Sequence, residues 1–149
     1  MTFATQMVLH HQLAVRMVST ADFQATNPAV KTIAAQVKAA NERELKQLTA
    51  WLVGWGVAVP SPSHGEDHAD EIPGMMTEDD WSKLGNAEGA KFDRLWIQLM
   101  IKHHQGAIAM AKIERSTGKD ARVKAFATSQ TTQSAEMTAM QSLLKRLPG

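Results

Sequence analysis

The chain has 149 residues, and its 16 lysine and arginine residues nearly balance its 15 aspartate and glutamate residues, for a formal net charge of +1. This length predicts one domain (residues 1–149) with a sizeable core, and the interspersed charges provide no basic stripe for nucleic acid. The chain contains no cysteine, which excludes disulfides, thiolate zinc sites, iron–sulfur clusters and thiol catalysis. Soft-metal chemistry would therefore need methionine and histidine side chains.

No apolar run approaches the length of a membrane span, and no signal-peptide pattern precedes the first motif. We therefore expect no membrane span in this chain. These two absences are compatible with two cellular locations. One is the cytoplasm, and the other is an extracytoplasmic compartment reached with an export segment that this sequence does not include.

The first predicted helix covers residues 3 to about 21. Its apolar residues and one of its histidines recur every three or four positions, which is the spacing of a single helical face. That face carries Met7, His10 and Met17. His11 lies toward the edge of the face and is four residues away from Met7, so that both histidines are neighbours of this methionine.

The second predicted helix begins at Asn27-Pro28, where asparagine is a favoured N-cap and proline a favoured first residue. Apolar residues at helical spacing continue it to about Trp55. Gly54 and Gly56 end it, and two prolines shortly afterwards prevent any continuation.

Residues 57–87 form the one long connection. The polar and acidic stretch of residues 61–71 has no apolar period, which predicts an exposed loop. His64 and His68 lie in this stretch among acidic residues. Such a segment can capture divalent metal ions, and the alternative is a solvated loop that binds nothing.

A capping-box pattern that begins at Thr77 predicts a short helix at the end of this connection. A third long helix is predicted for residues 88–116, and a fourth, with an aspartate as its cap, for residues 120–147. Asp93, near the start of the third helix, is explained by capping or by compensation of the helix dipole.

The second half of the chain repeats the first, with one repeat at about residues 2–56 and the other at about residues 88–147. Each repeat is a helical hairpin with a short turn, and the linker of residues 57–87 joins them. No stretch shows the alternation of a strand, so the sequence predicts an all-α protein built as a four-helix bundle. A one-residue gap in the repeat falls within the fourth helix, so contacts there need not mirror those of the first half.

The feature that dominates the sequence is a motif, M-x-x-H-H-Q-x-A-x-x-M, which occurs once in each repeat. Its candidate metal ligands are Met7, His10, His11, Met17, Met100, His103, His104 and Met110. Each of these residues, taken alone, is explained as an ordinary core residue. Two imidazoles buried in each half lose hydration unless each finds a partner, so the paired motifs favour metal binding.

A methionine precedes each histidine doublet at the position where a di-iron bundle would have a glutamate, which favours Cu(I), with Ag(I) as a mimic. Glu44 and Glu136 are expected to face the centre of the bundle and to orient a histidine ring, or to serve only as buried hydrogen-bond acceptors. Met137 and Met140 replace leucines of the first repeat. This favours the second half as the stronger site, although such an exchange is also ordinary core variation.

Several of these segments carry a family resemblance. The stretch Phe92-Asp93-Arg94-Leu95-Trp96 leads into the motif of the second repeat, and the first repeat, Glu44-Leu45, Trp51-Leu52 and Gly74-Met75-Met76 accompany it. Together they resemble the signature of the domain-of-unknown-function family 305 over nearly the whole chain. The resemblance implies a ferritin-like four-helix bundle that is usually exported or lipid-anchored in bacteria, and therefore a periplasmic or other extracytoplasmic location. Some members are periplasmic copper-binding proteins that contribute to copper resistance, which implies a copper role for the residues of both motifs.

Three hypotheses on function follow. The favoured one is a non-enzymatic Cu(I)-binding protein that stores or shuttles copper or contributes to copper resistance. The second is a haem- or metal-dependent redox protein, for which the sequence lacks both a C-x-x-C-H attachment motif and the carboxylates of a di-iron site. The third is a structural or partner-binding bundle whose histidines and methionines fill its core.

Overall fold

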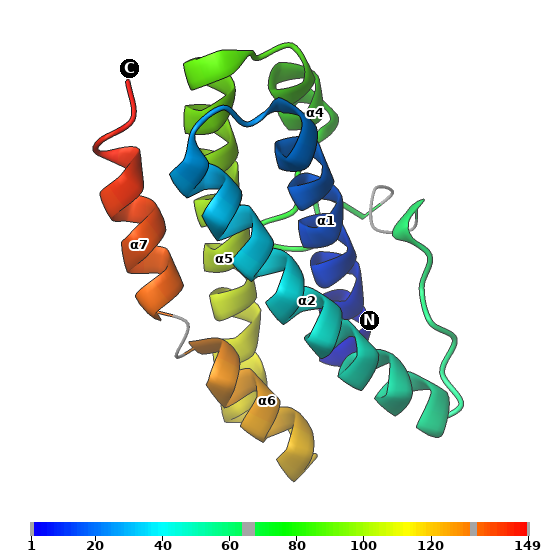
Figure 1. Cartoon of the computed structure of the whole chain (residues 1–149). Helices are drawn as coiled ribbons and strands as arrows, with labels where there is room; N and C mark the ends of the chain where they lie inside the picture. The colour runs from blue at the N-terminus through cyan, green and yellow to red at the C-terminus, as the bar shows by residue number, and fades with distance from the viewer. Residues whose placement is uncertain (1, 64–67, 132–133, 149) are drawn as a thin grey trace.

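The computed structural model describes residues 2–63, 68–131 and 134–148 of the chain. These residues form helices, turns and loops, with no strand among them, so the predicted all-α class is confirmed (Figure 1). The helices are α1 (Phe3–Gln24), α2 (Pro28–Gly54), α4 (Glu78–Gly85), α5 (Gly89–Thr117), α6 (Ala121–Thr131) and α7 (Ser134–Leu144).

The first hairpin is capped as its sequence predicts. Thr2 is the N-cap of α1, and its side chain accepts a hydrogen bond from the backbone N–H of Thr5. Asn27 caps α2 in the same way through Ala29, with Pro28 as the first helical residue. These bonds satisfy N–H groups that the first turn of a helix leaves without partners.

The fourth predicted helix corresponds to α6 and α7. Residues 132 and 133, between the two, lie outside the described part of the chain. Helix α7 ends at Leu144 rather than near residue 147, and Arg94 of α5 donates from Nη1 to the carbonyls of Leu144 and Leu147, 3.1 Å away in each case. A guanidinium thus satisfies carbonyls at the end of α7 that no further helical turn engages.

Helices α1 and α2 lie side by side, α5 packs along α6 and α7, and the two halves meet mainly where α1 packs against α5 (Figure 1). The indole of Trp96 on α5 is fully buried and donates from Nε1 to the carbonyl of Met17 on α1, at 2.8 Å. This bond satisfies the one polar group of a large core side chain across the contact between the halves.

Asp93 joins the same two halves at one end of the molecule. Its buried carboxylate accepts hydrogen bonds from the backbone N–H groups of Thr26 and Asn27, at 3.0 and 2.9 Å, and a third from the Thr26 hydroxyl. The prediction that Asp93 caps the helix that carries it is wrong, because α5 begins at Gly89 and Asp93 lies beyond its first turn. The carboxylate instead fixes the turn between α1 and α2 against the first turns of α5.

The linker is more deeply inserted than its polar composition predicts. Ile72, Met75 and Met76 are buried in the core. The predicted capping box is present, with Thr77 and Asp80 each bonded to the other's backbone N–H. We refer to residues 73–76 as the strap, because they cross α5 in direct contact with it.

The strap crosses α5 where two glycines meet. A Cβ on Gly106 of α5 would lie 2.1 Å from the carbonyl oxygen of Pro73, and a Cβ on Gly74 would lie 2.8 Å from that of His103. Gly74 also has a φ of +83°, a region that residues with a Cβ rarely adopt. Backbone therefore touches backbone here, which no other pair of residues would permit.

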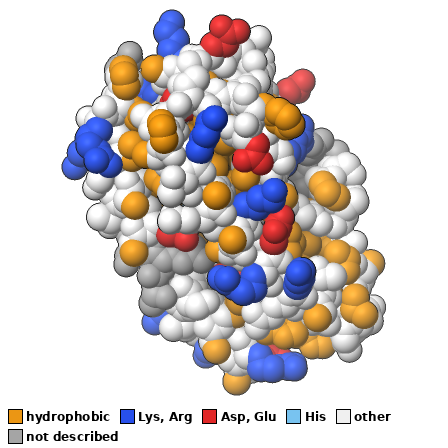
Figure 2. All heavy atoms as spheres, in the orientation of Figure 1, with side chains coloured by type: hydrophobic (Ala, Val, Ile, Leu, Met, Phe, Trp, Pro, Cys, Tyr) orange, Lys and Arg blue, Asp and Glu red, His pale blue; other side chains and the backbone are white. Residues whose placement is uncertain are grey.

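The surface carries both signs of charge. On the face shown in Figure 2, lysine and arginine side chains are interspersed with aspartate and glutamate side chains, and hydrophobic side chains lie between them. In the described residues, no helix has the length and apolar character needed to cross a membrane.

Candidate metal centre

The two histidine doublets meet at the contact between α1 and α5. The imidazole rings of His10 and His103 stack, with their centroids 3.6 Å apart and their planes inclined by 17°. His10, His11, His103 and His104 are only 1%, 3%, 3% and 5% exposed. Residues that lie far apart in the sequence thus form one buried cluster of four imidazoles.

His11 is held by a carboxylate of α2. Its Nε2 lies 2.6 Å from Oε2 of Glu44, which also accepts a hydrogen bond from the Gln130 side chain at 3.0 Å. The carboxylate oxygen is the acceptor in both contacts, so Nε2 of His11 is the donor to Glu44. Nδ1 of the same ring is buried and has no hydrogen-bond partner in the described part of the chain.

His104 has acceptors at both ring nitrogens. Nδ1 lies 3.1 Å from the carbonyl of Met100, and Nε2 lies 3.1 Å from Oε2 of Glu136 on α7. The hydrogen bond from His104 lowers the pKa of the Glu136 carboxyl, against the opposite effect of its partial burial. The two doublets therefore differ. Nδ1 of His11 has no hydrogen-bond partner in the described part of the chain, whereas both ring nitrogens of His104 face an acceptor.

The stacked pair is kept neutral by its surroundings. Burial, together with His11 and His104, holds the pKa of His10 well below its usual 6.5. Burial and the neighbouring His10 have the same effect on the pKa of His103. Nδ1 of His103 donates to the carbonyl of Gly74 at 3.3 Å, whereas Nε2 of His10 is buried without a partner among the described residues.

These rings line a small cavity of about 10 Å³, enough for roughly one water-sized particle. Its walls also include Asn41, Gln130, Ala40 and Ala107, with Glu44 and Glu136. No three histidine, aspartate or glutamate side chains among the residues that the structure describes are arranged to hold one metal ion together. The cavity therefore offers ring nitrogens without hydrogen-bond partners in the described part of the chain, but no completed ligand shell.

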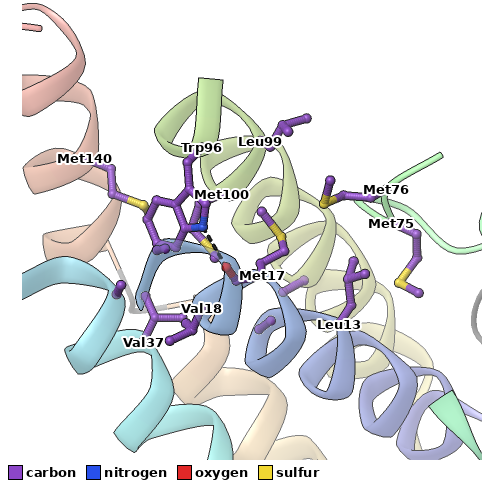
Figure 3. Packing of buried hydrophobic residues seen from close by; sticks show 14 of the residues in the cluster. Leu13, Met17, Val18, Val37, Met75, Met76, Trp96, Leu99, Met100 and Met140 are labelled. Carbon is purple, nitrogen blue, oxygen red and sulfur yellow. Dashed lines mark hydrogen bonds between the residues drawn. The ribbon is translucent and has the colours of Figure 1, made fainter. Parts of the chain in front are cut away.

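The motif methionines lie in the hydrophobic core and not in the lining of this cavity. Met7, Met17 and Met100 are fully buried, and Met110 is nearly so. Met100 and Met140 belong to the same core cluster as Trp96, and all three are labelled in Figure 3. Methionine side chains readily fill irregular gaps in such a core.

The remaining candidate metal ligands that the structure describes do not line this cavity. Met140 is buried, and Met137 is partly buried and packs against the core. Met110 lines a separate surface hollow of about 400 Å³. His68 is a part-exposed linker residue 3.1 Å from Glu71, and His64 lies outside the described residues.

Sequence reasoning missed the strap and Gln130. The sequence carried a signal for the strap, because the second copy of the motif has Gly106 where the first has Leu13. A glycine inside a long helix indicates a close approach of another backbone. Gln130, which supports Glu44, has no comparable signal, since its partner comes from a different hairpin.

Comparison with known proteins places these features in a family. The family model described as "Domain of unknown function (DUF305)" matches residues 1–144. No curated protein matches the chain.

Three solved structures illustrate the likeness. A DUF305 protein of Streptomyces coelicolor has 26% identity and a TM-score of 0.84, over 97% of this chain and 90% of that one. A DUF305 fragment from Deinococcus radiodurans has 26% identity and a TM-score of 0.83, over 97% and 94% of the two chains. CopM in its Cu(I)-bound form has 27% identity and a TM-score of 0.77, over 97% and 94%. The chain belongs to the DUF305 family.

Proposed function

We propose that this protein binds a soft metal ion, Cu(I) with Ag(I) as its mimic, in the core between α1 and α5, and that it stores or shuttles copper without catalysing a reaction. One observation carries the proposal. Two buried ring nitrogens, Nε2 of His10 and Nδ1 of His11, have no hydrogen-bond partner in the described part of the chain and belong to a cavity lined by all four motif histidines.

The energetics of these nitrogens support a ligand role. A buried polar atom without a partner destabilises a fold by about 1–3 kcal/mol. Protonation of His10 is unfavourable, because burial holds the pKa of this ring well below its usual value. A metal ion would satisfy the same lone pairs, and neutral imidazole is the form that binds metals.

The surrounding donors favour a soft ion over iron. Glu44 and Glu136 are already hydrogen-bonded to His11 and His104, whereas a di-iron site needs carboxylates that bind the metal directly. The remaining donors are imidazole and thioether, which suit Cu(I). Relatives support the same choice, since CopM has structures in Cu(I)-bound, Cu(II)-bound and Ag-bound forms.

We propose specific roles within the ligand set. His10, His11 and His103 supply nitrogen, and His104 can join only if one of its ring nitrogens turns away from the acceptor that it faces. Sulfur comes from the motif methionines Met7, Met17, Met100 and Met110. Met137 and Met140 are auxiliary sulfur residues of the second half. Glu44 and Glu136 orient the rings of His11 and His104.

Completing the shell requires some movement of side chains. His10 and His103 are stacked, so their rings do not converge on one point. Rotation of either ring, with a thioether turned inward from the core, would supply the missing ligands. Met side chains have three rotatable bonds and adapt readily to such a change.

We also propose an extracytoplasmic location. The chain has a structural relative predicted to be secreted, and its own ligand residues include no thiol that an oxidising compartment would convert to a disulfide. Storage or transfer of copper in such a compartment would contribute to copper resistance.

Titration of Cu(I) and Ag(I) tests the proposal. The wild-type protein is compared with His103→Ala/His104→Ala, and His68→Ala serves as a control outside the cavity. We expect the double variant to lose most of its high-affinity binding and the control to keep it. Unchanged binding by the double variant, or a wild-type protein that does not bind either ion, would overturn the assignment in favour of a purely structural role for these residues.

A further inference from the structure

The strap crosses α5 beside the stacked histidines. The carbonyl of Gly74 accepts from Nδ1 of His103 at 3.3 Å. The strap therefore contacts one ring of the stacked pair through a backbone carbonyl.

The strap is held in place on both sides. Ile72 before it, and Met75 and Met76 within it, are buried in the core. Beyond it, Asp80 of α4 accepts a hydrogen bond from Lys102 of α5 at 2.8 Å. Burial and an ion pair thus restrain the segment against α5 on either side of Gly74.

The crossing depends on the absence of a side chain at Gly106. A Cβ there would lie 2.1 Å from the Pro73 oxygen and 2.6 Å from Cα of Gly74, so the strap would have to move away. Both neighbours are backbone atoms, which cannot rotate aside as a flexible side chain can. The first copy of the motif has Leu13 at the equivalent position, so only His103 has this arrangement on its own helix.

We propose that the strap is a positioning element that selects the tautomer of His103. The Gly74 carbonyl keeps the proton on Nδ1, and Nε2 therefore holds the lone pair that the metal needs. Gly106 is the residue that makes this possible, by letting the strap lie directly on α5. The inference rests on the proposed soft-metal function for its consequence, but the tautomer itself is a property of the metal-free protein.

A backbone carbonyl that accepts a hydrogen bond from a ligand histidine fixes its tautomer and orientation, and loss of such a contact typically weakens metal affinity about 10–100-fold. The same range applies here if the strap is displaced. Gly106→Ala removes no ligand atom and adds only one methyl group. A loss of affinity together with a change in the His103 tautomer would therefore come from an altered contact between the strap and α5.

The first test is made on the wild-type protein without metal. Nitrogen-15 NMR with multiple-bond correlations distinguishes a protonated ring nitrogen from one with a lone pair, and a His103→Gln variant assigns the signals. We expect Nδ1 of His103 to be protonated and Nε2 to hold the lone pair. The opposite tautomer in the folded wild-type protein would overturn the proposal without any other measurement.

The second test compares Gly106→Ala with Gly54→Ala. Gly54 ends α2, and an added Cβ there has no atom within 4 Å, so this variant makes the same chemical change in open space. We expect Gly106→Ala to show a mixture of His103 tautomers and at least about tenfold weaker Ag(I) binding. Gly54→Ala should match the wild-type protein in both measurements.

The outcomes separate this inference from the proposed function. If the wild-type protein binds Ag(I) and Gly106→Ala keeps both the tautomer and the affinity, the strap has no positioning role. If the wild-type protein has the expected tautomer but does not bind Ag(I), the positioning stands and the metal function fails. If Gly106→Ala does not fold, the wild-type tautomer alone decides.

Discussion

Acidification should destabilise this protein through the stacked pair, His10 and His103. Both rings are buried, and burial is the first cause that holds the pKa of each well below 6.5. In the unfolded chain both return to about 6.5. The unfolded state therefore binds more protons than the folded state as soon as the pH falls toward that value.

The sign and size of the change in folding stability follow from this difference in proton binding. The stability that comes from keeping the two rings neutral is fully present above about pH 6.5 and is lost as the pH falls below it, until the lowered pKa is reached. Between about pH 7.5 and about pH 5.5, each histidine can remove at most about 1.4 kcal/mol of folding free energy. The two together give at most about 2.7 kcal/mol, a large part of the stability of an ordinary domain.

Denaturant unfolding of the metal-free protein at these two pH values measures the effect. The lowered pKa of Glu136 acts in the same direction but only below its unfolded value of 4.5, so it does not enter this window. A His10→Gln/His103→Gln variant should lose most of the pH dependence, and His68→Gln should keep it. If the double variant is destabilised by acid as strongly as the wild-type protein, the stacked pair is not the buried neutral pair described above.

Three further substitutions test other parts of the structure. Asp93→Ala removes the acceptor of three hydrogen bonds from the α1–α2 turn and leaves their donors partly buried. The free energy of unfolding, measured by denaturant titration, should therefore fall by about 3 kcal/mol. A loss below about 1 kcal/mol would contradict this role. Glu44→Gln and Glu136→Gln each weaken the acceptor that orients a histidine ring. Competitive titration should therefore show about 10–100-fold weaker Ag(I) binding in each variant. Wild-type affinity in both variants would contradict an orienting role.

The sequence predicted the helices well because their signals are local. The cap at Asn27-Pro28, the capping box that begins at Thr77 and the helical spacing of apolar residues each depend on residues only a few positions apart, and the structure has all three features. The boundary at the end of α7 was missed because its last carbonyls are satisfied by Arg94 of α5, a partner about fifty residues away.

The site was only partly predictable for the same reason. Spacing places each histidine doublet on a helix, but it cannot show that His10 and His103 stack, since that depends on how α1 packs against α5. Asp93 gives no local sign that it holds a turn of the other half. The strap was missed because polar composition dominates the linker, and because Gly106, the glycine that permits its close approach, lies in a different element.

The position of Ag(I) in crystals of the protein, located by its anomalous scattering, tests the central claim most directly. Our account predicts a silver ion between α1 and α5, within bonding distance of an imidazole nitrogen of His10, His11 or His103 and of a motif methionine sulfur. Silver bound only at the surface, for example at His68, with the four buried histidines unchanged, would contradict it.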